Sequence, residues 1–235
     1  GRLLATVRVL RKDGKFLFET EEATREKVFQ NLFRFTFAGD FFVEDLSEKY
    51  SCFSMQHSEL SIQEANFVSF EAKFGKDLFV PKEAAENFLT ELKNQNAVEI
   101  SDDLYEVLRI ENGVPVYSVD MDETTIVPEL GIGELISYNK GCYIGQEIIA
   151  RIHFRGHVAK QLTGLIFDDE NADIKPNGEI KSAEGKNAGR VTSVTFSPKL
   201  GKKIALAFVR YDYLAEGTEL KVNDSAARVK DLPFI

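Results

Sequence analysis

Cysteine is scarce in this 235-residue chain, and tryptophan is absent. The two cysteines, Cys52 and Cys142, lie far apart and provide no disulfide framework, which favours a reducing compartment. No apolar run approaches the roughly 18 residues that a membrane span requires, and no secretory signal peptide is recognisable. We therefore expect a cytoplasmic protein without a membrane partner, with a bacterial cytoplasm favoured over a mitochondrial matrix.

Positive charge is also in short supply. The chain has 29 lysines and arginines against 38 acidic residues, which gives a net charge of −9. An acidic chain is repelled by nucleic acid, so we expect no direct nucleic-acid partner and a monomer. Hydrophobic residues make up 43% of the sequence, which is ordinary for a globular protein, and 19 phenylalanines predict a phenylalanine-rich core.

The first part of the chain alternates strands and helices in an irregular order. Strands are predicted at residues 3–10, 16–20, 41–45, 50–55 and 66–70, with a small helix or loop at 56–66. Apolar residues at helical spacing predict helices at 24–33, 82–94 and 102–110. This order is typical of an α+β domain. The chain opens on Gly1 and runs directly into a strand, so we expect that an N-terminal segment precedes it.

Beyond His157 the pattern becomes almost wholly that of strands. Short apolar runs are separated by turns rich in glycine, proline and asparagine, and they predict strands at residues 162–167, 179–180, 189–194, 203–209, 219–222 and 226–229. Short strands with regular turns predict a small β-barrel or sandwich. We place the domain boundary between residues 158 and 159.

One stretch between these two regions combines reactive and conformationally special residues: Lys140-Gly141-Cys142-Tyr143-Ile144-Gly145-Gln146-Glu147. Glycine permits a tight loop beside a ligand, and the residues after Gly145 favour a helix. A cysteine just ahead of a helix N-terminus and close to a lysine is favoured as the thiolate. A glycine turn with a small buried cysteine explains the spacing equally well.

A second stretch, residues 109–120, contains two candidate ligand-binding carboxylates, Glu111 and Asp120. A carboxylate can accept a pair of adjacent N–H donors in bidentate fashion. Glu111 could instead pair with Arg109, and the acidic run around Asp120 could be a solvated loop. Tyr117 and Tyr143 could stack on a flat ring or simply pack in the core.

Residues 151–157 form the one conspicuously basic segment. Arg151 and Arg155 suit the carboxylates of an anionic ligand, although a solvated face is an equal alternative. His153 and His157 stand four apart, but no acid or cysteine completes a metal-ligand set. Two cysteines are too few for a stable iron–sulfur cluster held by one chain, so we predict no metal site.

The octapeptide around Cys142 resembles the signature of the YgfZ-type folate-binding proteins, which are relatives of the glycine-cleavage T-protein (GcvT, aminomethyltransferase). The resemblance covers nearly the whole chain. It implies an α+β folate-binding domain at residues 1–158, followed by a C-terminal β-barrel at residues 159–235. The implied ligand is tetrahydrofolate or a derivative.

The resemblance also implies roles for individual residues. Glu111 and Asp120 match the T-protein positions that bind the pteridine, and the remaining implied folate contacts are Tyr117, Tyr143 and Arg151. Cys142 and Lys140 are the implied catalytic residues. The rest of the motif consists of Gly141, Gly145, Gln146 and Glu147.

The function implied by the resemblance is that of an accessory protein that supports assembly or repair of iron–sulfur enzymes, including those that modify tRNA. Its expected partners are iron–sulfur client or assembly proteins. The corresponding T-protein segment, Lys-x-Phe-Ile-Gly, has no cysteine where this chain has Cys142. The alternatives are a tetrahydrofolate-dependent aminomethyltransferase or other one-carbon transferase, and a non-catalytic interaction module.

Overall fold

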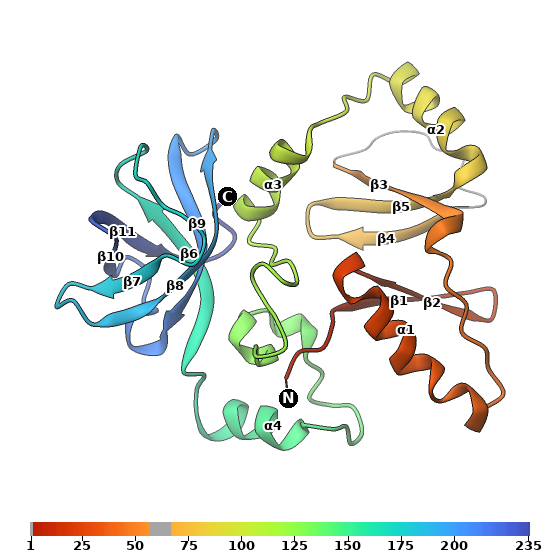
Figure 1. Ribbon diagram of the computed structural model, residues 1–235, viewed down its shortest axis with the longest axis horizontal. Coiled ribbons are helices and arrows are strands. Elements are labelled where there is room, and N and C mark those ends of the chain that lie inside the picture. The colour runs from red at the N-terminus through yellow and green to blue at the C-terminus, as the bar shows by residue number, and fades with distance from the viewer. Residues whose placement is uncertain (1, 57–66) are drawn as a thin grey trace. The chain divides into compact units, whose positions relative to one another are not determined.

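The computed structural model describes residues 2–56 and 67–235, which divide into two compact units (Figure 1). The N-terminal unit is Ala5–Ser101, and the barrel unit combines residues 2–4 with Asp102–Ile235. The helix or loop predicted at residues 56–66 lies, apart from Gln56, outside the described residues. The predicted domain boundary between residues 158 and 159 stays a prediction.

The N-terminal unit contains a two-stranded hairpin and a three-stranded sheet. Strands β1 (Val7–Lys12) and β2 (Lys15–Thr20) form the hairpin, and helix α1 (Arg25–Phe33) follows it. Strands β3 (Tyr50–Met55), β4 (Val68–Ala72) and β5 (Gly75–Pro81) are antiparallel in the order β3-β5-β4. Helix α2 (Lys82–Asn94) buries Phe88 and Leu92 against Leu78 and Val80 of β5. Apolar residues at helical spacing thus predicted both ends of α2 correctly.

Two strands of this unit differ from the sequence-based expectation. Residues 41–45 form no strand, and both Phe41 and Phe42 are exposed. Strand β5 was not predicted. Its first half contains the charged residues Lys76 and Asp77, and its last residue, Pro81, was interpreted as the start of the following helix. Cys52, on β3, is exposed.

The barrel unit is built around a closed six-stranded antiparallel barrel, with strand order β10-β11-β6-β9-β8-β7. The strands are β6 (Lys160–Phe167), β7 (Glu179–Ser182), β8 (Asn187–Ser197), β9 (Lys202–Arg210), β10 (Glu219–Val222) and β11 (Ser225–Lys230). Alternating side chains along these strands fill the interior, which contains Leu165, Ile180, Val191 and Leu220. The predicted α+β chain with a C-terminal β-barrel is confirmed.

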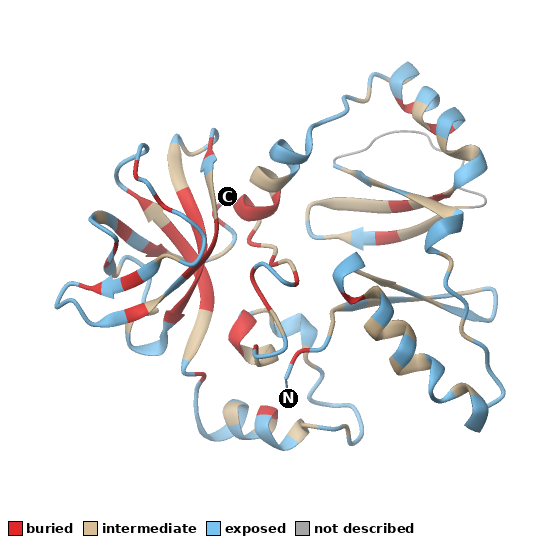
Figure 2. Cartoon of the chain, viewed as in Figure 1, coloured by how far each residue is buried: buried red, intermediate tan, exposed pale blue. Residues whose placement is uncertain are grey.

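A second core joins the outer surface of the barrel to the chain that precedes it. Helix α3 (Asp102–Glu111) contributes Ile110, and the loop after it contributes Tyr117, Met121 and Leu130. These side chains pack on Leu162, Ile204, Leu206 and Phe208 of β6 and β9. Buried residues accordingly concentrate in the barrel, at the end of α3 and in the loop after it (Figure 2). Helix α4 (Gln146–Arg155) leads into β6.

The phenylalanine-rich core is only partly present. Phe70, Phe88, Phe167, Phe208 and Phe234 are buried, but the phenylalanines between residues 33 and 42 are all exposed. Among the described helices, none is both long and apolar enough to cross a membrane.

Candidate functional site

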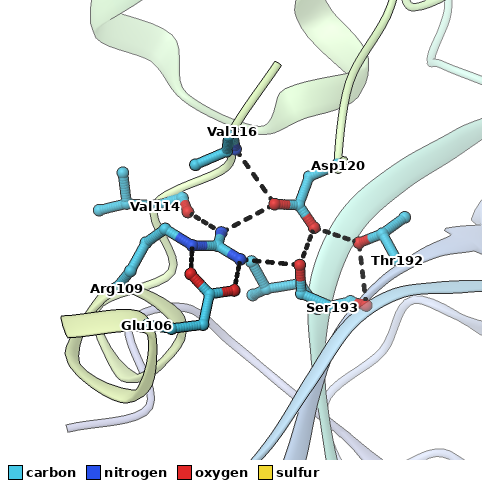
Figure 3. A network of polar contacts seen from close by, with 8 residues as sticks. Glu106, Arg109, Val114, Val116, Asp120, Thr192 and Ser193 are labelled. Carbon is cyan, nitrogen blue, oxygen red and sulfur yellow. Dashed lines mark hydrogen bonds and ion pairs between the residues drawn. The ribbon is translucent and has the colours of Figure 1, made fainter. Parts of the chain in front are cut away.

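The C-terminal end of α3 and the following loop meet the barrel at a cluster of polar side chains. We call it the Asp120 cluster, and it consists of Glu106, Arg109, Asp120, Thr192 and Ser193 (Figure 3). One carboxylate oxygen of Asp120 accepts hydrogen bonds from the hydroxyls of Thr192 (2.5 Å) and Ser193 (2.7 Å). The other accepts from Arg109 Nη1 (2.8 Å) and from the backbone N–H of Val116 (3.1 Å).

Arg109 is the cation of this cluster, and it is also buried. Its guanidinium forms an ion pair with Glu106, and it donates to the Val114 carbonyl (2.5 Å) and to Ser193 Oγ (2.8 Å). Burial by itself lowers the pKa of Arg109. The hydrogen bond to Glu106 and the negative charge of Asp120 outweigh burial, so the pKa lies above its ordinary value.

Glu111 is the last residue of α3, and it is likewise buried. Its Oε1 accepts a hydrogen bond from the Ser197 hydroxyl on β8, and its carbonyl accepts one from the Phe234 N–H (2.9 Å). Tyr117 packs in the second core. Every buried side-chain nitrogen and oxygen in the described part of the chain has a hydrogen-bond partner. The two predicted pteridine carboxylates are therefore interior groups with partners from β8.

The motif around Cys142 forms a loop that leads into α4. Gly145 adopts φ = +88° immediately before the helix, a conformation that favours glycine. The Gln146 side chain accepts from the Tyr143 backbone N–H (3.2 Å), while the Gln146 N–H donates to the Tyr143 carbonyl (3.3 Å). The prediction that a helix begins after Gly145 is confirmed.

The loop and α4 together line a hollow of about 440 Å³ that is open to solvent. We call it the α4 hollow, and it is lined by Ser137, Tyr138, Lys140, Tyr143, Gln146, Glu147, Ala150 and Phe154. Lys140 Nζ lies 4.4 Å from the centre of the Tyr143 ring. Tyr138 stacks on His153 with ring centres 3.9 Å apart. The hollow thus offers three aromatic side chains, one ammonium group and one carboxylate.

The predicted site residues fall into two groups in the structure. Lys140, Tyr143, Gln146 and Glu147 meet at the α4 hollow. Glu111, Asp120 and Tyr117 lie in the interior between α3 and the barrel. Cys142 is exposed, and in sequence it lies between Lys140 and Tyr143, which line the hollow. Gly141 and, on α4, Arg151 are also exposed.

Sequence reasoning missed several residues of both groups. Thr192, Ser193 and Ser197 belong to a strand far along the chain, and nothing in the sequence links them to Asp120 or Glu111. Tyr138 and Phe154 were discoverable, because they are aromatic residues that flank the motif. In the described part of the chain, no group of three or more His, Cys, Asp and Glu side chains is placed to hold a metal ion.

The barrel can be assigned by comparison with known proteins. Residues 160–235 match the model of the family described as "Glycine cleavage T-protein C-terminal barrel domain". These residues are therefore similar to the C-terminal barrel of the glycine-cleavage T-protein. The match begins at the first residue of β6 and therefore includes all six barrel strands.

Relatives named aminomethyltransferase extend this likeness beyond residues 160–235. The chain is 37% identical over 118 residues to an aminomethyltransferase of Rippkaea orientalis, an alignment that covers 50% of the chain and 31% of that protein. It is 26% identical to an aminomethyltransferase of Rubrobacter xylanophilus, with all of the chain and 70% of that protein covered. The chain thus spans about a third of the first relative, and its likeness is to aminomethyltransferases of the GcvT superfamily.

A solved structure shows the same fold. The crystal structure of the glycine cleavage system aminomethyltransferase T from Bartonella henselae superposes with a TM-score of 0.76. The superposition covers 100% of this chain and 73% of that one, at 16% sequence identity. The similarity of fold therefore covers the N-terminal unit as well as the barrel at residues 160–235.

Proposed function

We propose that this protein binds tetrahydrofolate or a derivative and takes part in aminomethyl or related one-carbon transfer. The observation that carries the proposal is the alignment of the entire chain with an aminomethyltransferase, together with the shared fold. Bound folate would supply the nitrogen atoms that carry the one-carbon unit. The residues of this chain would bind and orient it.

The residues of the α4 hollow fit parts of such a ligand. A reduced pterin is a flat ring with adjacent N–H donors, and its glutamate tail is anionic. Tyr138 and Phe154 present aromatic faces, Glu147 presents an acceptor and Lys140 a cation. Arg151, exposed on the same helix, suits the tail carboxylates.

Glu111 and Asp120 remain the proposed pteridine carboxylates by resemblance. Their present partners define what such a role requires. A pterin would have to replace the Ser197 hydroxyl on Glu111, or the Thr192 and Ser193 hydroxyls on Asp120. Hydroxyl and pterin donors are both neutral, so what such an exchange would gain is the second, bidentate hydrogen bond to the carboxylate.

A second candidate function is that of an accessory factor for iron–sulfur enzymes, in the manner of the YgfZ-type proteins. The observation that favours it is the exposed Cys142 in the motif loop. An exposed thiol next to Lys140 is available to a partner protein without any change in the fold. In this case folate binding would persist and aminomethyl transfer would be absent.

Anaerobic calorimetric titration of the full chain with tetrahydrofolate, paired with an aminomethyl-transfer assay, tests both candidates. Binding with transfer supports the transferase, and binding without transfer supports the accessory factor. Absence of binding contradicts both and leaves an interaction module. We expect Glu111→Ala to weaken binding by about 1–3 kcal/mol through loss of a charge-assisted pair. The matched control is Glu184→Ala on the exposed β7–β8 turn, which should leave the dissociation constant unchanged.

A further inference from the structure

The solvent-facing side of α4 combines apolar and basic side chains, and neither candidate function uses Ile148 or Arg155 among them. Its five members are Glu147, Ile148, Arg151, Phe154 and Arg155, which we call the α4 face. Arg151 lies three or four residues from each of the other four, so all five project from one side of the helix. All five are exposed, whereas Ile149 on the opposite side is buried.

The apolar members of this face are unusually open to solvent. Phe154 is 73% exposed and Ile148 41%. Ile144, in the motif loop just before α4, is fully exposed. An apolar surface of this kind, edged by charges, is characteristic of a protein-binding site.

The charges of the α4 face are unbalanced. Arg151 and Arg155 stand four residues apart, and like charges at this spacing repel one another. Neither forms an ion pair or hydrogen bond with any residue that the structure describes. Glu147 is the single acid of this face, so its two arginines leave a net positive charge there. In a chain of net charge −9, that local positive charge favours an acidic group.

We propose that the α4 face docks an acidic, amphipathic segment of a partner protein. Its carboxylates would pair with Arg151 and Arg155, and its apolar side chains would cover Ile144, Ile148 and Phe154. The aliphatic members decide between partner classes, because isoleucine side chains offer no flat surface on which a nucleic-acid base could stack. This inference does not depend on folate binding.

The first test uses the full chain and a fluorescently labelled synthetic peptide that carries glutamate and leucine at helical spacing. We expect saturable binding by fluorescence anisotropy, with affinity falling as salt rises because the pairing is partly electrostatic. A peptide with lysine in place of every glutamate should not bind. No saturable binding of the acidic peptide, or equal binding of the lysine peptide, would overturn the proposal.

The decisive variant is I148S/R155E, because neither residue lines the α4 hollow or belongs to the proposed folate contacts. We expect it to weaken the peptide affinity by about tenfold, the change caused by loss of one well-buried anchor. The matched control is F196S/K199E on the barrel, where exposed residues undergo the same two kinds of change. Equal weakening in both variants would contradict docking at the α4 face.

Two further measurements exclude other occupants. Sedimentation of the chain alone should show no self-association that increases with concentration. Self-association that I148S/R155E abolishes would instead identify a second copy of the chain as the occupant. A single-stranded oligonucleotide should bind more weakly than the acidic peptide. Folate titration of I148S/R155E should match that of the unaltered chain, which separates failure of this proposal from failure of the folate proposal.

Discussion

The Asp120 cluster and the α4 hollow contain residues of one expected site, yet they have opposite physical character. In the Asp120 cluster, carboxylate, guanidinium and hydroxyls are buried and paired with one another. At the α4 hollow, the ammonium of Lys140 lies over the Tyr143 ring, and Glu147 faces solvent. The difference teaches that residues of one expected site can differ in exposure and pairing: one set is already hydrogen-bonded inside the protein, and the other faces solvent.

Removing the charge at the centre of the cluster should have the largest effect. Asp120→Ala leaves the buried Arg109 with only Glu106 as an anionic partner, and breaking a buried ion pair costs about 3–5 kcal/mol. Urea denaturation followed by circular dichroism measures this loss. Asp224→Ala, in an exposed turn, is the control and should stay within about 0.5 kcal/mol of the unaltered chain. Equal stability of the two variants would show that the cluster is not structural.

A smaller loss is expected at Glu111. Glu111→Ala removes the acceptor of the buried Ser197 hydroxyl, and an unsatisfied buried donor costs about 1–3 kcal/mol. Glu111→Gln keeps an acceptor oxygen at the same place and should recover part of the stability. The same denaturation experiment distinguishes them, and a glutamine variant as unstable as the alanine variant would argue against the hydrogen bond as the cause.

Backbone strain at the motif loop should cost less again. Gly145→Ala places a side chain at φ = +88°, which costs about 1–2 kcal/mol. Gly141→Ala is the matched control, because its φ is not in the left-handed region and its Cβ would meet no atom within 4 Å. Hydrogen exchange of the first turn of α4 reports the change. If the amide protons of the first turn exchanged faster in both variants, the left-handed conformation of Gly145 would not be what stabilises the start of α4.

The last prediction concerns the reactivity of the two cysteine thiols, and we expect no effect on stability. Partial desolvation of the Cys52 thiol, with the charge of Asp77, raises the pKa of Cys52 to about 11. Its alkylation by iodoacetamide, measured in a Cys142→Ser variant, should therefore be slow at pH 8 and rise until about pH 11, since only the thiolate reacts. A rate that levels off near pH 9 would contradict this. The Cys52→Ser variant provides the corresponding profile for Cys142.

The sequence predicted those features that depend on neighbours along the chain. The spacing of Phe88 and Leu92 located α2, Gly145 located the start of α4, and the turns beyond His157 indicated the barrel strands. It failed where pairing is decided at long range. β5 has charged residues in its first half and exists because β3 and β4 bind both of its edges.

The candidate site shows the same limit. Lys140, Tyr143, Gln146 and Glu147 were predicted together because they are adjacent in sequence, and they meet at the α4 hollow. The grouping of Asp120 with Glu111 came from the resemblance to the T-protein, with carboxylate chemistry as support. Their partners Thr192, Ser193 and Ser197 come from β8, and no local pattern encodes a contact across so much chain.

Closure of the barrel has a consequence for how the chain opens. In the three-stranded sheet, β3 and β4 are terminal strands, and fraying can start at either. In the barrel each strand is bonded on both sides, with β10 joining β7 to complete the ring. Opening therefore requires two ladders to separate at once. Amide protons around the ring should accordingly exchange with solvent at nearly one common rate, as a single cooperative unit.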